Sequence, residues 1–218
     1  MDVLRLIESY TPANQQEQSD KSEMLSFLKD YPNCFSRENT RGHFTASSWI
    51  LNEERTKTLF CYHKIYNSWS WTGGHADGET DLLKVAIKEA VEETSVTVKA
   101  YKENIFSLEI LPVAGHFKNE KYVSPHLHYN LTFLIIGDED KEIRSNADEN
   151  TGVKWIRLSD VIKESNEPHM HPIYEKLISN SEGEKRSEGE KRSEVGGRNS
   201  ENLLLQRGDS RSVTSDTK

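Results

Sequence analysis

The stretch from Trp71 to Val96 constrains the fold more than any other part of the chain. It reads WTGGHADGETDLLKVAIKEAVEETSV, so a strand-like run meets a helix-like run through a loop that contains three glycines. Glycine permits positive φ and close backbone approach, which a loop needs when its own carbonyls or amides must reach a ligand. Thr80 is the predicted N-cap of the helix, with Asp81 in the first turn, where the helix dipole favours an acid.

The predicted helix carries an apolar stripe and an acidic stripe. At about 100° per residue, five side chains fall on one face and predict its contact with the core: Leu83, Ala86, Ile87, Ala90 and Thr94. Spacings of three and four residues bring Glu89, Glu92 and Glu93 to an adjacent stripe, where like charges repel and a cation would reverse the repulsion. Mg²⁺ prefers oxygen and commonly takes one or two carboxylates, so Glu89 and Glu93 are candidate ligands. The alternative is a solvated acidic helix face.

The loop and helix together resemble the Nudix box, G-x5-E-x7-R-E-U-x-E-E-x-G-U, in which U is a bulky aliphatic residue. The residues in register with the box are Gly74, Glu89, Glu92, Glu93 and Val96. The Arg, aliphatic and Gly positions hold Lys88, Ala90 and Ser95. The early Glu is shifted, because Thr80 stands in its register and Glu79 directly precedes it. GGHADGE followed by a full-length helix looks like a loop variant of the box, and the resemblance extends over roughly residues 42 to 178.

This resemblance to the Nudix hydrolases implies an α/β fold, an α/β/α sandwich with a mixed sheet. It implies that Glu89, Glu92 and Glu93 bind Mg²⁺ (or Mn²⁺), that one of them helps to deprotonate water, and that the Gly74 carbonyl adds a ligand. Water would then attack a phosphorus of a nucleoside diphosphate linked to another group, a reaction that depends on preorganised electrostatics. Lys88 stands where the family has an Arg that orients a catalytic Glu, so it completes the predicted catalytic set.

Two departures from the box leave other functions open. Lys88 offers a flexible point charge in place of a planar fork, and Ser95 replaces a Gly near the helix end, where positive φ is common. Both favour a Nudix-like domain that binds a nucleotide or metabolite as a sensor without turnover. A third reading is a Nudix-like prenyl diphosphate isomerase, for which Cys61 is the one candidate cysteine. Cys34 and Cys61 lack metal-ligand spacing and are predicted to be buried thiols.

Four further residues are candidates for substrate contacts. His75, directly beside Gly74, is a candidate phosphate contact. His126 and His128 lie two apart on a predicted strand and therefore point to one face, where they could contact substrate or relay a proton. A zinc site at this pair is disfavoured because no third ligand is evident. Glu149, in the predicted loop NADENTGVKW, is a candidate general base. The plainer alternatives are a loop histidine, a hydrogen-bonded structural pair and an exposed loop acid.

Composition bounds the rest of the chain. Residues 1–41 are predicted to form a helical N-terminal extension, 42–178 the Nudix domain, and 179–218 a disordered low-complexity tail in which SEGEKR occurs twice. A net charge of −8 disfavours nucleic acid and anionic membranes as partners, and no apolar run has bilayer length. A cytoplasmic location is therefore expected, and the resemblance to the Nudix hydrolases implies a small nucleotide-type substrate. The oligomeric state stays open, with a homodimer as one option.

Overall fold

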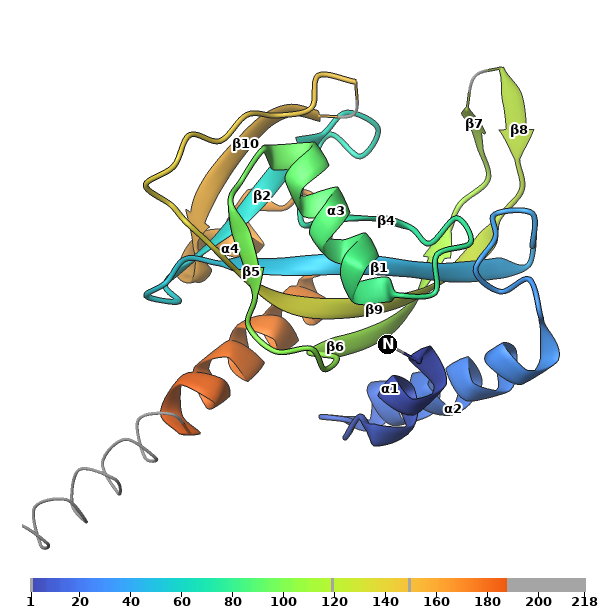
Figure 1. Cartoon of the computed structure of the whole chain (residues 1–218). Helices are drawn as coiled ribbons and strands as arrows, with labels where there is room; N and C mark the ends of the chain where they lie inside the picture. The colour runs from blue at the N-terminus through green and yellow to red at the C-terminus, as the bar shows by residue number, and fades with distance from the viewer. Residues whose placement is uncertain (1, 119, 149, 188–218) are drawn as a thin grey trace, which may run out of the picture. The chain divides into compact units, whose positions relative to one another are not determined.

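The computed structural model describes residues 2–118, 120–148 and 150–187 (Figure 1). The chain forms two compact units, Met1–Leu177 and Ile178–Lys218. In the second unit, residues 178–187 are helical, where the sequence predicted a disordered tail from residue 179. An ion pair between Glu182 and Arg186, one helical turn apart, stabilises this helix. The remainder of the predicted tail lies outside the described residues.

A mixed β-sheet forms the centre of the first unit, as the sequence predicted (Figure 1). Its strands follow the order β10-β2-β1-β9-β5, with β3 paired to β2, β4 to β1 and β6 to β9. The strands of this sheet are β1 (Gly42–Leu51), β2 (Lys57–His63), β3 (Ser68–Ser70), β4 (Thr72–His75), β5 (Val98–Ala100), β6 (Ser107–Val113), β9 (His126–Gly137) and β10 (Asn150–Arg157). A separate antiparallel pair consists of β7 (His116–Lys118) and β8 (Lys121–Val123).

Strands β1 and β9 are the central pair and run parallel, from Gly42 opposite Leu127 to Leu51 opposite Ile136. The other pairings of this sheet are antiparallel. β1 is buried along its whole length, and β9 is buried from Tyr129 onward. Burial on both faces explains why these strands read as runs of apolar and small polar residues.

Helices cover both faces of the sheet. α3 (Leu82–Thr94) lies across β1 on one face (Figure 1), where the Ser48 hydroxyl donates to the Ala86 carbonyl at 2.8 Å. The next side chain along β1, Trp49, points to the other face and stacks on Tyr174, in the helical residues 171–177. A 3-10 turn η1 (Leu158–Asp160) and the short helix α4 (Val161–Glu164) precede those residues. The predicted α/β/α sandwich is therefore confirmed.

Two N-terminal helices, α1 (Val3–Ser9) and α2 (Gln15–Asp30), belong to the same compact unit as the sheet. α2 lies along the edge strand β6, where the Asp20 carboxylate accepts the Ile110 N–H at 3.0 Å. The Gln16 side chain donates to the Leu108 carbonyl of the same strand. These bonds cover a strand edge that would otherwise expose unpaired backbone groups. No helix within the described part of the chain is long and apolar enough to cross a membrane.

Candidate active site

The loop between β4 and α3 fixes where the helix begins. The N-cap is Asp81, whose side chain accepts the Lys84 N–H, one residue later than the predicted Thr80. The reason lies in Glu79, whose carboxylate accepts the N–H groups of both Thr80 and Asp81 and ties them to the loop. The local sequence thus indicated the helix correctly but misplaced its start by one residue.

The buried face of α3 is rotated relative to the predicted apolar stripe. Ala86, Ala90 and Thr94 are buried as predicted, whereas Leu83 and Ile87 are only half-buried. The other buried residues of the helix are Leu82, Val85 and Glu93. The helix therefore turns one of its three candidate carboxylates into the interior.

Glu93 is the most firmly held of the three carboxylates and is only 5% exposed. One of its oxygens accepts the Gly73 N–H at 2.9 Å, and the other accepts the Asn150 side-chain amide at 2.9 Å. Hydrogen bonds to an ionised acceptor are stronger than neutral ones, so these two contacts fix the carboxylate in orientation. Asn150 was not singled out from the sequence, although it directly follows Glu149. Glu149 itself lies outside the described residues.

Glu89 packs directly on the backbone of Gly74. A Cβ atom placed on Gly74 would lie 2.5 Å from the Glu89 Cδ and 2.7 Å from its Oε2, so only glycine permits this approach. Glu92 behaves differently: its side chain is 53% exposed, compared with 18% for Glu89. The Lys88 Nζ lies 3.0 Å from a Glu92 oxygen and 3.2 Å from a Glu89 oxygen. Glu93 and Glu89 thus contact Gly73 and Gly74, hereafter the double-glycine segment, while Glu92 stays at the surface.

The donors at the double-glycine segment fit a hard divalent cation. Glu89 and Glu93 supply carboxylate oxygens, the kind of ligand that Mg²⁺ prefers. The missing Cβ of Gly74 leaves the Glu89 carboxylate in contact with the backbone, which is the approach that a shared ligand set requires. Hydrogen bonds to Glu92 and then to Glu89 raise the pKa of Lys88, so its ammonium stays charged and offsets the repulsion between the carboxylates. Glu92 pairs with the same ammonium through one of its oxygens.

Ser95 ends α3 in the left-handed conformation, with φ 56° and ψ 14°. Its N–H donates to the Val91 carbonyl at 2.8 Å. The sequence predicted positive φ at this position, and the structure confirms it. A serine here costs about 1 kcal/mol relative to glycine.

Both cysteines are buried free thiols, as predicted. The Cys61 thiol contacts the Glu93 carbonyl at 3.8 Å. Burial, followed by the charge of Glu93, raises the pKa of Cys61, so the thiol stays protonated and shielded from solvent. The accessible cysteine that an isomerase mechanism would need is not provided by this residue.

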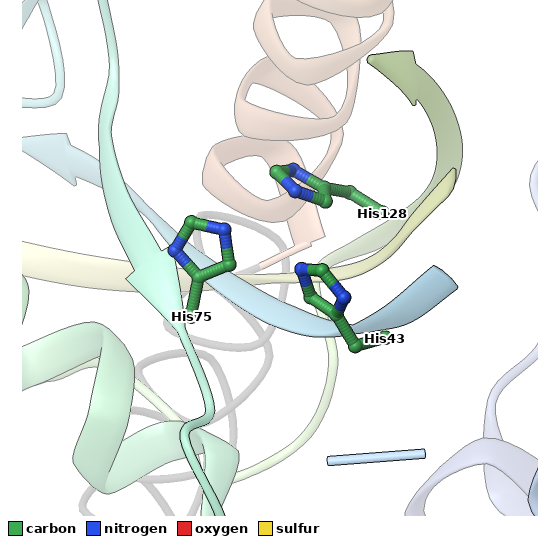
Figure 2. A group of neighbouring side chains, drawn as sticks. All are labelled: His43, His75 and His128. Carbon is green, nitrogen blue, oxygen red and sulfur yellow. The ribbon is translucent and has the colours of Figure 1, made fainter. Parts of the chain in front are cut away.

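The candidate histidines lie together, but not with the carboxylates. His75 and His128 have ring centroids 4.9 Å apart, and His126 lies 5.1 Å from His128. Their common neighbour is His43, 5.0 Å from each of the three, which the sequence did not single out. Figure 2 shows the rings of His43, His75 and His128 turned toward one another from three strands. Because side chains alternate along a strand, His75 faces away from the side on which Gly74 meets Glu89.

Comparison with known proteins agrees with the geometry. The NUDIX domain model matches residues 42–177. Similar solved structures include an Ap4A hydrolase from C. elegans (19% identity, 64% of this chain and 98% of that chain, TM-score 0.48). A second is a NUDIX family hydrolase from Clostridium perfringens (19% identity, 63% of this chain and 96% of that chain, TM-score 0.45). A third is the E. coli dihydroneopterin triphosphate pyrophosphohydrolase (12% identity, 63% of this chain and 95% of that chain, TM-score 0.46). No curated protein matches the chain. Because the domain model covers well over half of it, the chain belongs to the Nudix hydrolase family, whose enzymes act on phosphoric anhydride bonds.

Proposed function

We propose that the protein is a Mg²⁺-dependent hydrolase of a nucleoside diphosphate linked to another group. The observation that carries this proposal is the approach of two carboxylates, Glu89 and Glu93, to the double-glycine segment Gly73–Gly74 within β4. Mg²⁺, or Mn²⁺ in its place, would neutralise phosphate oxygens and increase the acidity of a bound water. The carboxylates of α3 would hold the ion together with the Gly74 carbonyl.

The surrounding residues give this site its rigidity. The Gly73 N–H and the Asn150 amide each occupy one oxygen of Glu93, so its carboxylate is oriented before substrate arrives. Groups that orient metal ligands in this way contribute to both affinity and activity. Lys88 holds Glu89 through its ammonium, in the position where the family has arginine. We assign Glu92 a secondary role, because its carboxylate is largely exposed and pairs with Lys88.

The substrate class is tested with a panel of nucleotide sugars, dinucleotides, ADP-ribose and nucleoside triphosphates. Each compound is incubated with Mg²⁺ or Mn²⁺, and the products are separated and quantified. The proposal expects metal-dependent cleavage of an anhydride bond in at least one compound. Binding of a nucleotide without any product would instead support the sensor function that Lys88 and Ser95 left open.

The role of Glu93 is tested by Glu93→Gln, with Glu92→Gln as the matched control on the exposed side of the same helix. Loss of a preorganised charge in the site should lower turnover by roughly 10²-fold or more, and Glu92→Gln should lower it less. Mg²⁺ should raise the melting temperature of the wild type more than that of Glu93→Gln. The proposal is wrong if Glu93→Gln keeps full turnover and the full stability gain from Mg²⁺.

The Glu93→Gln protein is expected to fold. The new amide oxygen can still accept the Gly73 N–H. The Asn150 Oδ1 is buried and has no hydrogen-bond partner among the residues that the structure describes, so a flipped Asn150 can accept the new amide N–H. The loss of two charge-assisted bonds should cost about 1–2 kcal/mol, which a melting curve measures directly.

A further inference from the structure

Three imidazoles from three neighbouring strands surround one point of the sheet (Figure 2). His43 on β1 is the direct partner of His128 on β9, and His75 on β4 is the partner of Thr45, two residues further along β1. Residues two apart on a strand share a face, so the three rings gather on one side of the sheet. One ring nitrogen from each histidine lies within 4.8 Å of the others.

This group is separate from the carboxylates of α3. Ser48, five residues after His43 on β1, donates to the helix and therefore points to the opposite face. On β4, Gly74 faces Glu89 and the next residue, His75, faces the other way. The histidines and the carboxylates thus lie on opposite faces of the same strand.

His43 has a buried nitrogen that needs a partner. The residue is 3% exposed, and its Nδ1 lies 3.4 Å from the Asn39 carbonyl. A carbonyl only accepts, so Nδ1 carries the proton and Nε2 presents a lone pair. Within residues 2–118, 120–148 and 150–187, this buried Nε2 has no hydrogen-bond partner. Leaving a buried polar atom unpaired is unfavourable, and a metal ion would satisfy it.

His126 orients the third ring. The His126 Nδ1 lies 2.8 Å from the Ser124 carbonyl and therefore donates to it, which leaves its Nε2 as an acceptor. That Nε2 lies 3.2 Å from the Nε2 of His128, so His128 donates there and retains a lone pair on Nδ1. Neutral imidazole is the form that binds metal ions.

We propose that His43, His75 and His128 bind a divalent transition-metal ion, with Zn²⁺ as the preferred species and a fourth position open. Imidazole nitrogens suit Zn²⁺, whereas Mg²⁺ selects oxygen. Zn–N bonds of about 2.0–2.1 Å place tetrahedral ligands roughly 3.3 Å apart, so the rings must close by about 1.5 Å from their widest separation. The ion would hold the end of β4, directly after Gly74, to both central strands.

The test uses the full chain, freed of any affinity tag because a histidine tag binds the same ions. Co²⁺, whose visible absorption reports nitrogen ligands, is titrated in the presence of excess Mg²⁺, which occupies the oxygen donors. We expect one equivalent of Co²⁺ to bind, to be displaced by Zn²⁺, and to raise the melting temperature. His75→Gln, at a half-buried ring, should weaken binding at least about tenfold. His116→Gln, which changes a histidine outside the group, should bind as the wild type does.

Two results with the wild type and the histidine variants would overturn the site, and a third would come from Glu93→Gln. One is a wild type that takes up no stoichiometric Co²⁺ or Zn²⁺, which would make the histidines a hydrogen-bonded cluster only. The other is equal affinity in the wild type, His75→Gln and His116→Gln. Glu93→Gln separates this proposal from the hydrolase: it should lose turnover and keep its Co²⁺ binding. A Glu93→Gln protein that loses the spectroscopic signal would place the ion at the carboxylates instead.

Discussion

Replacing Gly74 with alanine tests the catalytic site with a single methyl group. The new Cβ would lie 2.5 Å from the Glu89 Cδ and 2.7 Å from its Oε2. Carbon atoms in contact prefer about 3.5–4.0 Å, so the carboxylate must retreat by about 1 Å. Gly74 does not have positive φ, so alanine fits its backbone without strain. The clash falls on the end of a flexible side chain, and the fold should lose less than about 1 kcal/mol.

Gly74→Ala is therefore expected to change the rate of catalysis more than the stability of the fold. A displacement of about 1 Å of a positioned group can cost roughly 10²-fold in rate, so Gly74→Ala should lower kcat/KM by about 10- to 100-fold. The assay measures kcat/KM against Mg²⁺ concentration, with the substrate identified in the panel, and a melting curve on the same sample. Full turnover in Gly74→Ala would refute the claim that Glu89 acts from its position against this glycine.

Gly78→Ala is the matched control in the same loop. Gly78 has φ +90°, and a Cβ placed there meets nothing within 4 Å. Alanine in this conformation costs about 1 kcal/mol, which lowers the melting temperature by about 2–4 °C in a chain of this size. Turnover should stay near the wild-type value. Gly74→Ala should thus lower activity and keep stability, whereas Gly78→Ala should lower stability and keep activity. If both variants lose activity and stability together, the loop is disrupted as a whole.

Two further predictions concern stability. Ser95→Gly relieves the left-handed C-cap of α3 and should raise the melting temperature by about 2–4 °C, because about 1 kcal/mol of backbone strain is removed; an unchanged melting curve would contradict this. Burial alone would raise the pKa of Glu17, but hydrogen bonds from Lys176, Ala13 and Tyr10 hold it below the ordinary 4.5. Because its pKa is lower in the folded state, the ionised Glu17 stabilises the fold above pH 4.5. This stabilisation is lost as the pH falls through the folded-state pKa. The wild-type melting temperature should therefore fall more steeply below pH 4.5 than that of Glu17→Gln, and parallel curves would exclude Glu17 as the cause.

The loop and helix of the candidate site were predictable because their signals are local. Glycines mark the loop, and spacings of three and four residues mark the acidic stripe, so both follow from neighbouring positions. The one-residue error at the helix start came from a side chain, since Glu79 competes for the backbone N–H groups of Thr80 and Asp81. Such competition depends on rotamers that a residue pattern does not specify.

The burial of Glu93 was not predictable in the same way. Periodicity placed it on an acidic stripe with Glu92, and nothing in that pattern distinguishes an exposed acid from a buried one. The distinction comes from Asn150, 57 residues later, whose amide binds the Glu93 carboxylate. Two long-range contacts bring Asn150 to the helix: the pairing of β10 with β2, beginning with Asn150 opposite His63, and a backbone bond from the Asn146 N–H to the Glu93 carbonyl at 3.0 Å. Contacts distant in the sequence therefore decide which carboxylate is fixed.

The histidine group required still more of the fold. His43 and His128 are 85 residues apart and become direct neighbours through the parallel register of β1 and β9. A parallel pair needs a long crossover connection, so no hairpin signal in the sequence reveals it. Because residues two positions apart on a strand point to the same face, the sequence did identify His126 and His128 as a pair. Of that pair only His128 belongs to the proposed site, and the other two histidines, His43 and His75, lie on β1 and β4, which only the strand register brings beside it.

The alternation of side chains along β4 places two kinds of metal donor back to back. Gly74 opens one face to the oxygens of Glu89, and His75 turns an imidazole to the other face. Oxygen donors select hard ions and imidazoles select Zn²⁺-like ions, so on both proposals each face binds its own ion without competition. A chelator selective for Zn²⁺ should then loosen β4 from one side and leave Mg²⁺ binding intact. Because Gly74 and His75 are adjacent, loosening His75 would also shift the backbone against which Glu89 is held. Turnover would then fall because Glu89 is misplaced, while Mg²⁺ stays bound.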